Sequence, residues 1–172
     1  GQILGHWNAE RQVFEGGHFG VYEFHPVVSK LQVYCSEDLG AFYLDVLKDR
    51  LYTTAPKSLA RRSAQTALWR ITHAMLRWMA PFLSFTAEEA WQVFDHQTSS
   101  NNTIFTEEFH TLPTIKNAEE LLNKWSRIRE IRSDITKAIE NEREAGRVGS
   151  SLQAEIQIHA NSQDAQLLAS LQ

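Results

Sequence analysis

Hydrophobic side chains recur every three or four positions along most of this chain, which is the spacing of α-helices with one apolar face. The first such run covers residues 24–34 and the second covers residues 39–47. Gly40 lies between the apolar positions of the two runs, and glycine weakens a helix by about 1 kcal/mol relative to alanine. A break or bend is therefore expected there. Pro56 ends the second run, because proline disfavours the α conformation of the residue before it.

The clearest helical pattern begins after Ser58, a favourable N-cap residue. It continues to Pro81, which should stop or kink it. A capping box from Thr86 to Glu89 is then expected to open a short helix. The polar residues 95–113 predict a long connection, in which residues 103–105 favour a short strand.

A second capping box, from Asn117 to Glu120, predicts the start of a long helix that Gly146 and Gly149 end. The segment from Leu152 to His159 then alternates strictly between apolar and polar residues, as a half-buried strand does. One strand cannot form a sheet. Either the chain stops before a further α+β subdomain, or this strand pairs with residues of the long connection.

These patterns predict a mainly α fold with two parts. Residues 1–113 are expected to form an antiparallel helical bundle, and residues 114–172 a long helix with a short strand-bearing tail. With 42% hydrophobic and 22% charged residues, the composition is that of a soluble globular protein. No apolar run approaches the ~20 residues that a membrane span needs. The single cysteine, Cys35, fits a reducing cytosol, so a cytoplasmic protein is expected.

Motifs for catalysis or metal binding are missing from the sequence. The segment from Gly16 to Gly20 lacks the spacing and the lysine of a phosphate-binding loop. The seven histidines show no paired metal-ligand spacing, and His73 is expected on the polar surface of its helix. Cys35 has no activating base nearby in the sequence and is expected to be a buried thiol. No catalytic residue and no metal ligand is therefore expected in this chain.

The basic residues are unevenly distributed. The chain as a whole has a net charge of −4, which does not suggest a nucleic-acid-binding protein. Between Lys48 and Ala87, however, Asp49 is the only acid, and seven basic residues give a local charge near +6. These are Lys48, Arg50, Lys57, Arg61, Arg62, Arg70 and Arg77. A segregated positive face attracts polyanions in a salt-dependent manner; the alternative is a merely solvated or salt-bridged face.

Trp69 stands out within this basic segment. A helical projection places it opposite the main apolar stripe, on one face with Arg62, Gln65, Thr66, His73 and Arg77. An aromatic ring beside arginine and glutamine suits stacking on an unpaired nucleobase. The alternative is that Trp69 packs against another helix or against the 95–113 connection. The sequence leaves both interpretations open.

Three segments resemble the anticodon-binding domain of isoleucyl-tRNA synthetases. They are Phe42–Tyr52 (FYLDVLKDRLY), Ala60–Leu68 (ARRSAQTAL) and Met79–Trp91 (MAPFLSFTAEEAW). Residues 131–152 are similar to the next segment of the bacterial form, so the resemblance covers roughly residues 20–160. A looser version of these motifs occurs in synthetases for valine, leucine, methionine and cysteine. The alternatives are therefore a valine or leucine synthetase, a helical interaction module with no RNA role, and a standalone helical enzyme.

The resemblance implies a parent enzyme that joins isoleucine to its tRNA at the expense of ATP. The His-Ile-Gly-His and Lys-Met-Ser-Lys motifs of its catalytic domain are absent from this sequence. ATP and Mg²⁺ would thus belong to a catalytic domain outside the chain. The same holds for editing and for a cysteine-rich zinc module, since one cysteine cannot build that module. The expected partners are isoleucine tRNA and the catalytic and editing domains, with no DNA and no membrane.

Charge, expected exposure and these family-like motifs together select eight candidate tRNA-binding residues. They are Lys48, Arg50, Tyr52, Arg61, Arg62, Gln65, Trp69 and Arg70. Lysine and arginine would contact phosphates, while the aromatic and amide side chains would read unstacked bases. Arg50 has an alternative role as a structural partner of Asp45 or Asp49.

Overall fold

Helices form most of this protein, as the spacing of apolar residues predicts. The structure, a computed structural model, describes residues 3–94 and 103–171, apart from the side chains of Trp7 and Phe14. Contacts divide the chain into two units, Gly1–Leu112 and Pro113–Gln172. Each unit has its own packing and is described by itself.

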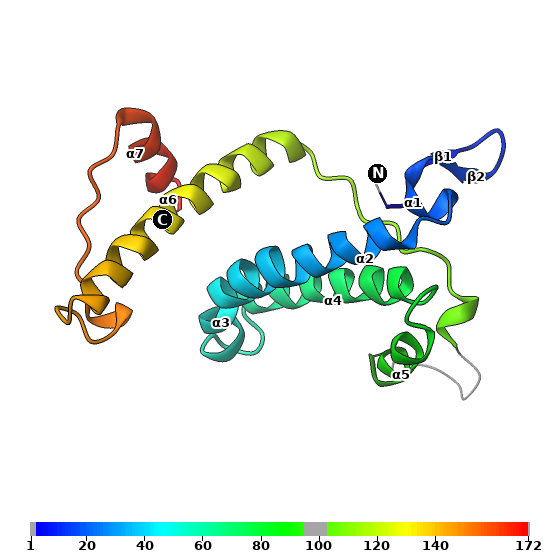
Figure 1. Ribbon diagram of the computed structural model, residues 1–172, viewed down its shortest axis with the longest axis horizontal. Helices are drawn as coiled ribbons and strands as arrows, with labels where there is room; N and C mark the ends of the chain where they lie inside the picture. Colours follow the sequence, from blue (N-terminus) through cyan, green and yellow to red (C-terminus); the bar gives the residue numbers. More distant parts are fainter. Residues whose placement is uncertain (1–2, 95–102, 172) are drawn as a thin grey trace. The chain divides into compact units, whose positions relative to one another are not determined.

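Two antiparallel helical rods form the centre of the first unit (Figure 1). One rod is continuous and the other, α4, runs back beside it. The elements are α2 (Phe24–Val33), a π-helix (Tyr34–Leu44), α3 (Asp45–Tyr52) and α4 (Leu59–Met79). Val27, Leu31, Leu47 and Ala64 are buried on these helices, so the predicted apolar stripes do form the packed faces.

The break expected at Gly40 does not occur, because the helix widens there instead. Gly40 lies in the middle of the π-helix, whose backbone hydrogen bonds span five residues rather than four. A Cβ at Gly40 would lie 2.9 Å from the carbonyl oxygen of Cys35, closer than real side chains come. Glycine is therefore the residue that this wider turn accommodates. Cys35 itself is exposed, so the expectation of a buried thiol is wrong.

The ends of α4 match the sequence signals. The Ser58 hydroxyl accepts a hydrogen bond from the backbone N–H of Arg61 at 3.2 Å, which caps the first turn. At the other end α4 stops at Met79, two residues before Pro81. Helix α5 (Ser84–Phe94) begins before the predicted capping box, so Thr86 lies inside the helix and caps nothing.

Glu88, a member of that predicted box, binds the connection that follows α5. Its carboxylate accepts hydrogen bonds from the Ile104 backbone N–H at 2.8 Å and from the Thr103 hydroxyl at 2.9 Å. The Ile104 bond is the main reason why the pKa of Glu88 lies below its usual value. Residues Ile104–Thr106 consequently form a 3₁₀ turn, not the predicted strand.

A small core joins this turn to α4 and α5. Ile104 is 2% exposed and Trp91 of α5 is 1% exposed. They pack with Leu76, Ala80 and Ala87. The connection between the two units is thus anchored in the first unit, although residues 95–102 lie outside the described part of the chain.

The N-terminal segment forms a hairpin that the sequence patterns did not predict. Strand β1 (His6–Asn8) pairs antiparallel with β2 (Val13–Glu15), and the short helix α1 (Gly17–Gly20) follows. The Asn8 side chain accepts hydrogen bonds from the two backbone N–H groups of Glu10 and Arg11. Strands of three residues are too short to show alternation, which is why periodicity missed them.

The second unit is built on the long helix α6 (Ala118–Glu144). Asn117 occupies the N-cap position in a left-handed conformation, φ 59°, and its side chain makes no capping hydrogen bond. The predicted end is confirmed. Gly146 adopts φ 71°, and the backbone N–H groups of Gly146 and Arg147 bond to the carbonyls of Arg143 and Glu142. These two hydrogen bonds together form a Schellman motif, which glycine stabilises.

The strand predicted for residues 152–159 is not formed. A 3₁₀ turn (Ser151–Gln153) leads into an irregular segment and then into α7 (Ser162–Ala169). No described residue pairs with it as a strand. Instead its apolar members Ile156 and Ile158 line one pocket together with Ile135 and Ile139 of α6. Both Ile156 and Ile158 remain 48% exposed, so the alternation marks a segment that borders a hollow on α6 and does not form a buried strand. An ion pair between Arg127 and Asp164 at 2.8 Å ties α6 to α7.

Candidate nucleic-acid interface

Five cations between α3 and the middle of α4 form no ion pair with any residue that the structure describes. They are Arg50, Lys57, Arg61, Arg62 and Arg70. We call them the α3–α4 cationic cluster. Elsewhere in the chain Arg77, Arg127 and Arg143 pair with carboxylates. Because no acid compensates these five charges, they give this part of the first unit a positive potential that attracts polyanions.

Helix α3 presents its candidate residues on two different sides. Lys48 lies one turn from Tyr52, which is 81% exposed. A hydrogen bond to Asp45, 2.9 Å long, raises the pKa of Lys48. Arg50 faces Tyr43 instead, where burial raises the pKa of the tyrosine and the arginine partly opposes the rise. Asp45 thus pairs with Lys48, and no ion pair of Arg50 with Asp45 or Asp49 is found among the described residues.

Hydrogen bonds order the turn between α3 and α4. The Thr54 hydroxyl donates to the Arg50 carbonyl at 2.5 Å, and the Ser58 hydroxyl donates to the Thr54 hydroxyl at 3.2 Å. Arg61 then reaches back from α4 and donates from one Nη to the Thr54 carbonyl at 3.2 Å. This contact uses one of the five N–H groups of the guanidinium and fixes its direction. The remaining groups are free to bind a phosphate.

The predicted polar stripe of α4 is exposed only in its first half. Arg62, Gln65 and Thr66 are exposed, and Trp69 is 49% exposed. Beyond Trp69, helix α5 and the following connection cover the same side. Within that covered stretch the side chain of Arg77 is only 10% exposed. Arg70 lies about 80° around the helix from Arg62, so the cluster curves around α4.

Trp69 lies where the exposed part of the α4 polar stripe meets the part that is covered by α5 and the connection. Its ring is 4.0 Å from the ring of His73, 6.4 Å from Phe94 and 6.2 Å from His110, measured between centroids. We call these four residues the ring cluster. The expectation of a surface His73 is wrong, because Trp91 and Phe94 of α5 pack against it at 5.2 and 5.0 Å. The interpretation that Trp69 packs against other elements is confirmed. About half of its surface is still exposed, and its stacking on a nucleobase stays a prediction.

Arg77 is a structural cation and takes no part in the exposed cluster. Its guanidinium pairs with Glu107, donates to Nδ1 of His73 and lies 4.6 Å above the ring of Trp91. It thereby joins α4, α5 and the connection. Sequence reasoning grouped it with the exposed cations because only the fold brings Glu107 to it.

His110 and Phe94 are the members of the candidate site that the sequence did not single out. His110 lies in a segment predicted to be a loop, where no periodicity marks a packed side chain. Burial lowers the pKa of His110, and the positive charges of Arg77 and Arg70 lower it further. The folded protein therefore favours the neutral imidazole.

This preference predicts a pH-dependent stability. Below the ordinary histidine pKa of about 6.5 the unfolded chain binds a proton that the folded chain resists. The contribution of His110 is fully present above that pH and is lost as the pH falls through the folded pKa. Urea unfolding between about pH 7.5 and 5.5 should show the His110→Gln variant losing less stability than the unaltered chain. The His25→Gln variant, at an exposed site, should behave like the unaltered chain; equal slopes for all three would contradict the assignment.

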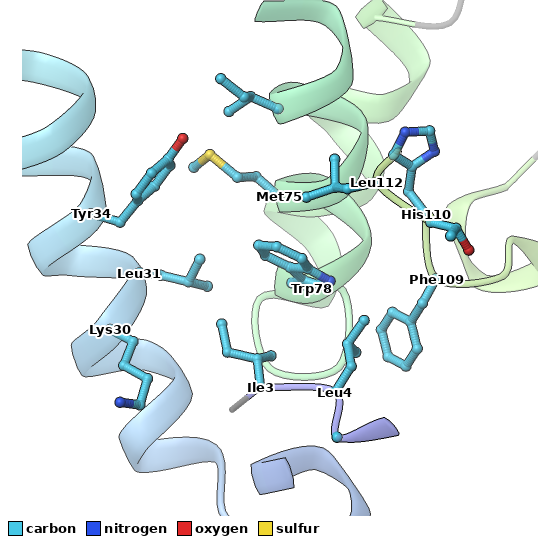
Figure 2. Close-up of a pocket in the computed structure, with 13 residues that line it drawn as sticks. Ile3, Leu4, Lys30, Leu31, Tyr34, Met75, Trp78, Phe109, His110 and Leu112 are labelled. Carbon is cyan, nitrogen blue, oxygen red and sulfur yellow. The ribbon is translucent and has the colours of Figure 1, made fainter. Parts of the chain in front are cut away.

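An apolar pocket of about 800 Å³ lies between α2 and α4, away from the cationic cluster. Figure 2 shows Leu31 and Tyr34 facing Met75 and Trp78 across it. Residues 3–5 and 109–112 also contribute to its lining. Trp78 is 16 residues beyond Arg62 on α4, or roughly 24 Å along the helix axis. The pocket thus extends away from the cationic cluster along α4, while His110 belongs both to its lining and to the ring cluster.

Among residues 3–94 and 103–171, no three histidine, cysteine, aspartate or glutamate side chains lie closely enough together to hold a metal ion. Likewise, no helix there is both long and apolar enough to cross a membrane.

Comparisons with known proteins place this arrangement in a family. Residues 16–158 match the anticodon-binding domain of tRNA ligase. The isoleucine–tRNA ligase of Ralstonia pickettii is 62% identical over 154 residues, which are 90% of this chain and 16% of that protein. That of Cupriavidus taiwanensis is 60% identical over 154 residues, again 90% and 16%. For Burkholderia multivorans the identity is 56% over 165 residues, or 96% and 17%.

The chain thus spans about a sixth of the length of these curated relatives. The family match covers most of the chain and includes the whole α3–α4 cationic cluster. This chain belongs to the family of anticodon-binding domains of tRNA ligases.

Proposed function

We propose that this chain is the tRNA-binding part of an isoleucine–tRNA ligase and that it holds the anticodon stem-loop of isoleucine tRNA. The observation that carries the proposal is the α3–α4 cationic cluster, five cations without an ion-pair partner among the described residues. It lies within the stretch that matches the family. The names of the similar proteins supply the amino acid.

The two kinds of candidate side chain have different tasks in this proposal. Arg61, Arg62, Arg70, Arg50 and Lys48 contact backbone phosphates and set the position of the RNA. Lys48 does so while sharing its charge with Asp45. Tyr52, Gln65 and Trp69 are exposed near these cations, and they contact unstacked anticodon bases by stacking and hydrogen bonding.

The proposal assigns the chemical steps to other parts of a longer protein. In it, the parent enzyme joins isoleucine to tRNA with ATP in the cytoplasm, and its catalytic domain binds ATP and Mg²⁺. A zinc module and an editing domain would likewise lie outside this chain. The described residues then contribute binding and orientation of the tRNA and perform no catalytic step.

Salt-dependent tRNA binding tests the proposal. The 172-residue chain is titrated with isoleucine tRNA at about 50 to 200 mM salt. If two to four phosphates are contacted, each contributes a slope of roughly 0.7 to 0.9 in a plot of log affinity against log salt, and affinity should fall roughly 7- to 150-fold over this range. Isoleucine tRNA should bind more tightly than valine tRNA, leucine tRNA or a DNA hairpin of equal length.

The competing interpretations give different results in the same titration. A helical interaction module without an RNA role would bind none of the four nucleic acids. A synthetase domain for another aliphatic amino acid would prefer valine or leucine tRNA. Equal, weak binding to all four would show only nonspecific attraction to a polyanion and would contradict the proposal.

A further inference from the structure

Trp69 packs against three other aromatic rings, although about half of its surface is exposed. The three other members of the ring cluster approach it from three segments: His73 from α4 itself, Phe94 from the end of α5, and His110 from the connection. These rings also contact one another, at 5.0 Å between His73 and Phe94 and at 5.4 Å between His73 and His110. The four rings therefore contact one another in a closed cycle that includes Trp69.

Such support matters for binding, because an exposed tryptophan on a free helix loses rotamer freedom when a ligand orders it. Here the fold has already restricted that freedom. The indole thus presents its exposed part to solvent in a fixed orientation, and a flat ligand that stacks on it avoids the ordering cost.

The surroundings of the exposed part indicate the chemistry of the ligand. Arg70 is the next residue along α4 and has no ion-pair partner among the described residues. Gln65 and Arg62 are exposed one and two turns before Trp69 on the same stripe. An exposed flat ring fits an unpaired nucleobase, since every base has a face that can stack. Arg62 lies two turns earlier on the helix and Arg70 about 100° around its axis, and both guanidinium groups lack an ion-pair partner among the described residues, which suits the phosphates of the same RNA.

We infer that His73, Phe94 and His110 are positioning residues that hold Trp69 as a platform for one unpaired base of a bound RNA loop. This inference rests on the proposed function and adds to it: the stacking surface is a cluster from three segments, and Phe94 and His73 act on RNA through Trp69. The contact of Trp69 is with the base, while the phosphates contact the arginines.

The inference is tested by separating stacking from charge. Isoleucine tRNA is labelled with 2-aminopurine, a fluorescent base that stacking quenches, at single positions of the anticodon loop. Binding of the unaltered chain and of Trp69→Ala, Trp69→Phe, Phe94→Leu and Arg70→Ala is measured at several salt concentrations. Phe85→Ala on α5 and Trp125→Ala on α6 are matched controls, because these rings are 93% and 41% exposed outside the cluster.

Stacking on an uncharged ring releases no counterions, so loss of Trp69 should weaken binding about tenfold at every salt concentration with an unchanged salt slope. Trp69→Phe should restore most of the affinity. Phe94→Leu should weaken binding a few-fold and reduce the quenching at one loop position, while thermal unfolding shows the variant fully folded at the assay temperature. Arg70→Ala should instead reduce the slope by about 1.

Three results would overturn the inference. If Trp69→Ala binds as the unaltered chain does while Arg70→Ala is weaker, the chain binds RNA but the ring cluster is not its platform. If Phe94→Leu loses affinity without any change in quenching, Phe94 does not position Trp69. If the unaltered chain binds no tRNA, the proposed function fails, and with it this inference.

Discussion

Replacing Arg61 and Arg62 together by alanine is expected to weaken binding of isoleucine tRNA roughly 10- to 100-fold at low salt, about 50 mM, and to reduce the salt slope by about 2. These residues open α4, and neither forms an ion pair with a described residue. Arg61 is already directed by its bond to the Thr54 carbonyl, so its charge is available without reorganisation. The loss should be similar for cognate and noncognate tRNA, because phosphates carry no sequence information.

The matched control is the pair Arg143→Ala and Arg147→Ala at the end of α6. It also removes two positive charges, but these two arginines form ion pairs with Glu140 and Glu142, respectively. Isothermal titration of both double variants, with circular dichroism to confirm folding, separates a local site from a general charge effect. An equal loss of affinity in the two variants would mean that net charge, and not the α3–α4 cationic cluster, attracts the RNA.

Trp91→Ala should produce the largest loss of stability of any single substitution in the first unit. Trp91 is 1% exposed, packs with Leu76, Ala87 and Ile104, and lies under the guanidinium of Arg77. Removal of a buried tryptophan side chain costs about 3 to 5 kcal/mol, because apolar contacts are lost and a cavity remains. The thermal unfolding midpoint should accordingly fall by roughly 10 °C or more.

Two further variants on the same residue and helix sharpen this measurement. Trp91→Phe keeps an aromatic ring and removes the indole N–H, which is buried without a hydrogen-bond partner in the described structure, so its cost should be much smaller. Phe85→Ala removes a ring that is 93% exposed and should change stability little. If Trp91→Ala and Phe85→Ala unfold at the same temperature, the packing around Trp91 does not stabilise the unit.

Local signals predicted the helices well where one residue type decides the outcome. Ser58 caps α4, the helix stops just before Pro81, and Gly146 ends α6. Each of these depends on the conformation of a few neighbouring residues. The predictions that were wrong concern segments whose structure the neighbouring residues do not decide. The capping box at Thr86 and the strand at residues 152–159 have suitable local patterns. However, α5 already begins at Ser84, and no partner strand for residues 152–159 is found among the described residues.

In the candidate site, too, some features depend on the local sequence and others on residues far away in the chain. The run of basic residues could be recognised from the sequence, because its unequal charge is a property of composition. Which of these cations are neutralised depends on distant partners. Arg77 meets Glu107, thirty residues later, whereas Arg62 and Arg70 meet no described acid. The half-burial of Trp69 likewise depends on His110, which is 41 residues away in the chain.

The π-helix between Tyr34 and Leu44 should let this part of the chain tolerate the deletion of one residue. In an α-helix a deleted residue turns everything beyond it by about 100°. A π-helical turn already contains one residue more than α-helical bonding requires, so losing it restores an ordinary turn and leaves the direction of α3 unchanged. A lineage can therefore lose a residue here while Lys48 and Tyr52 keep their side of the helix.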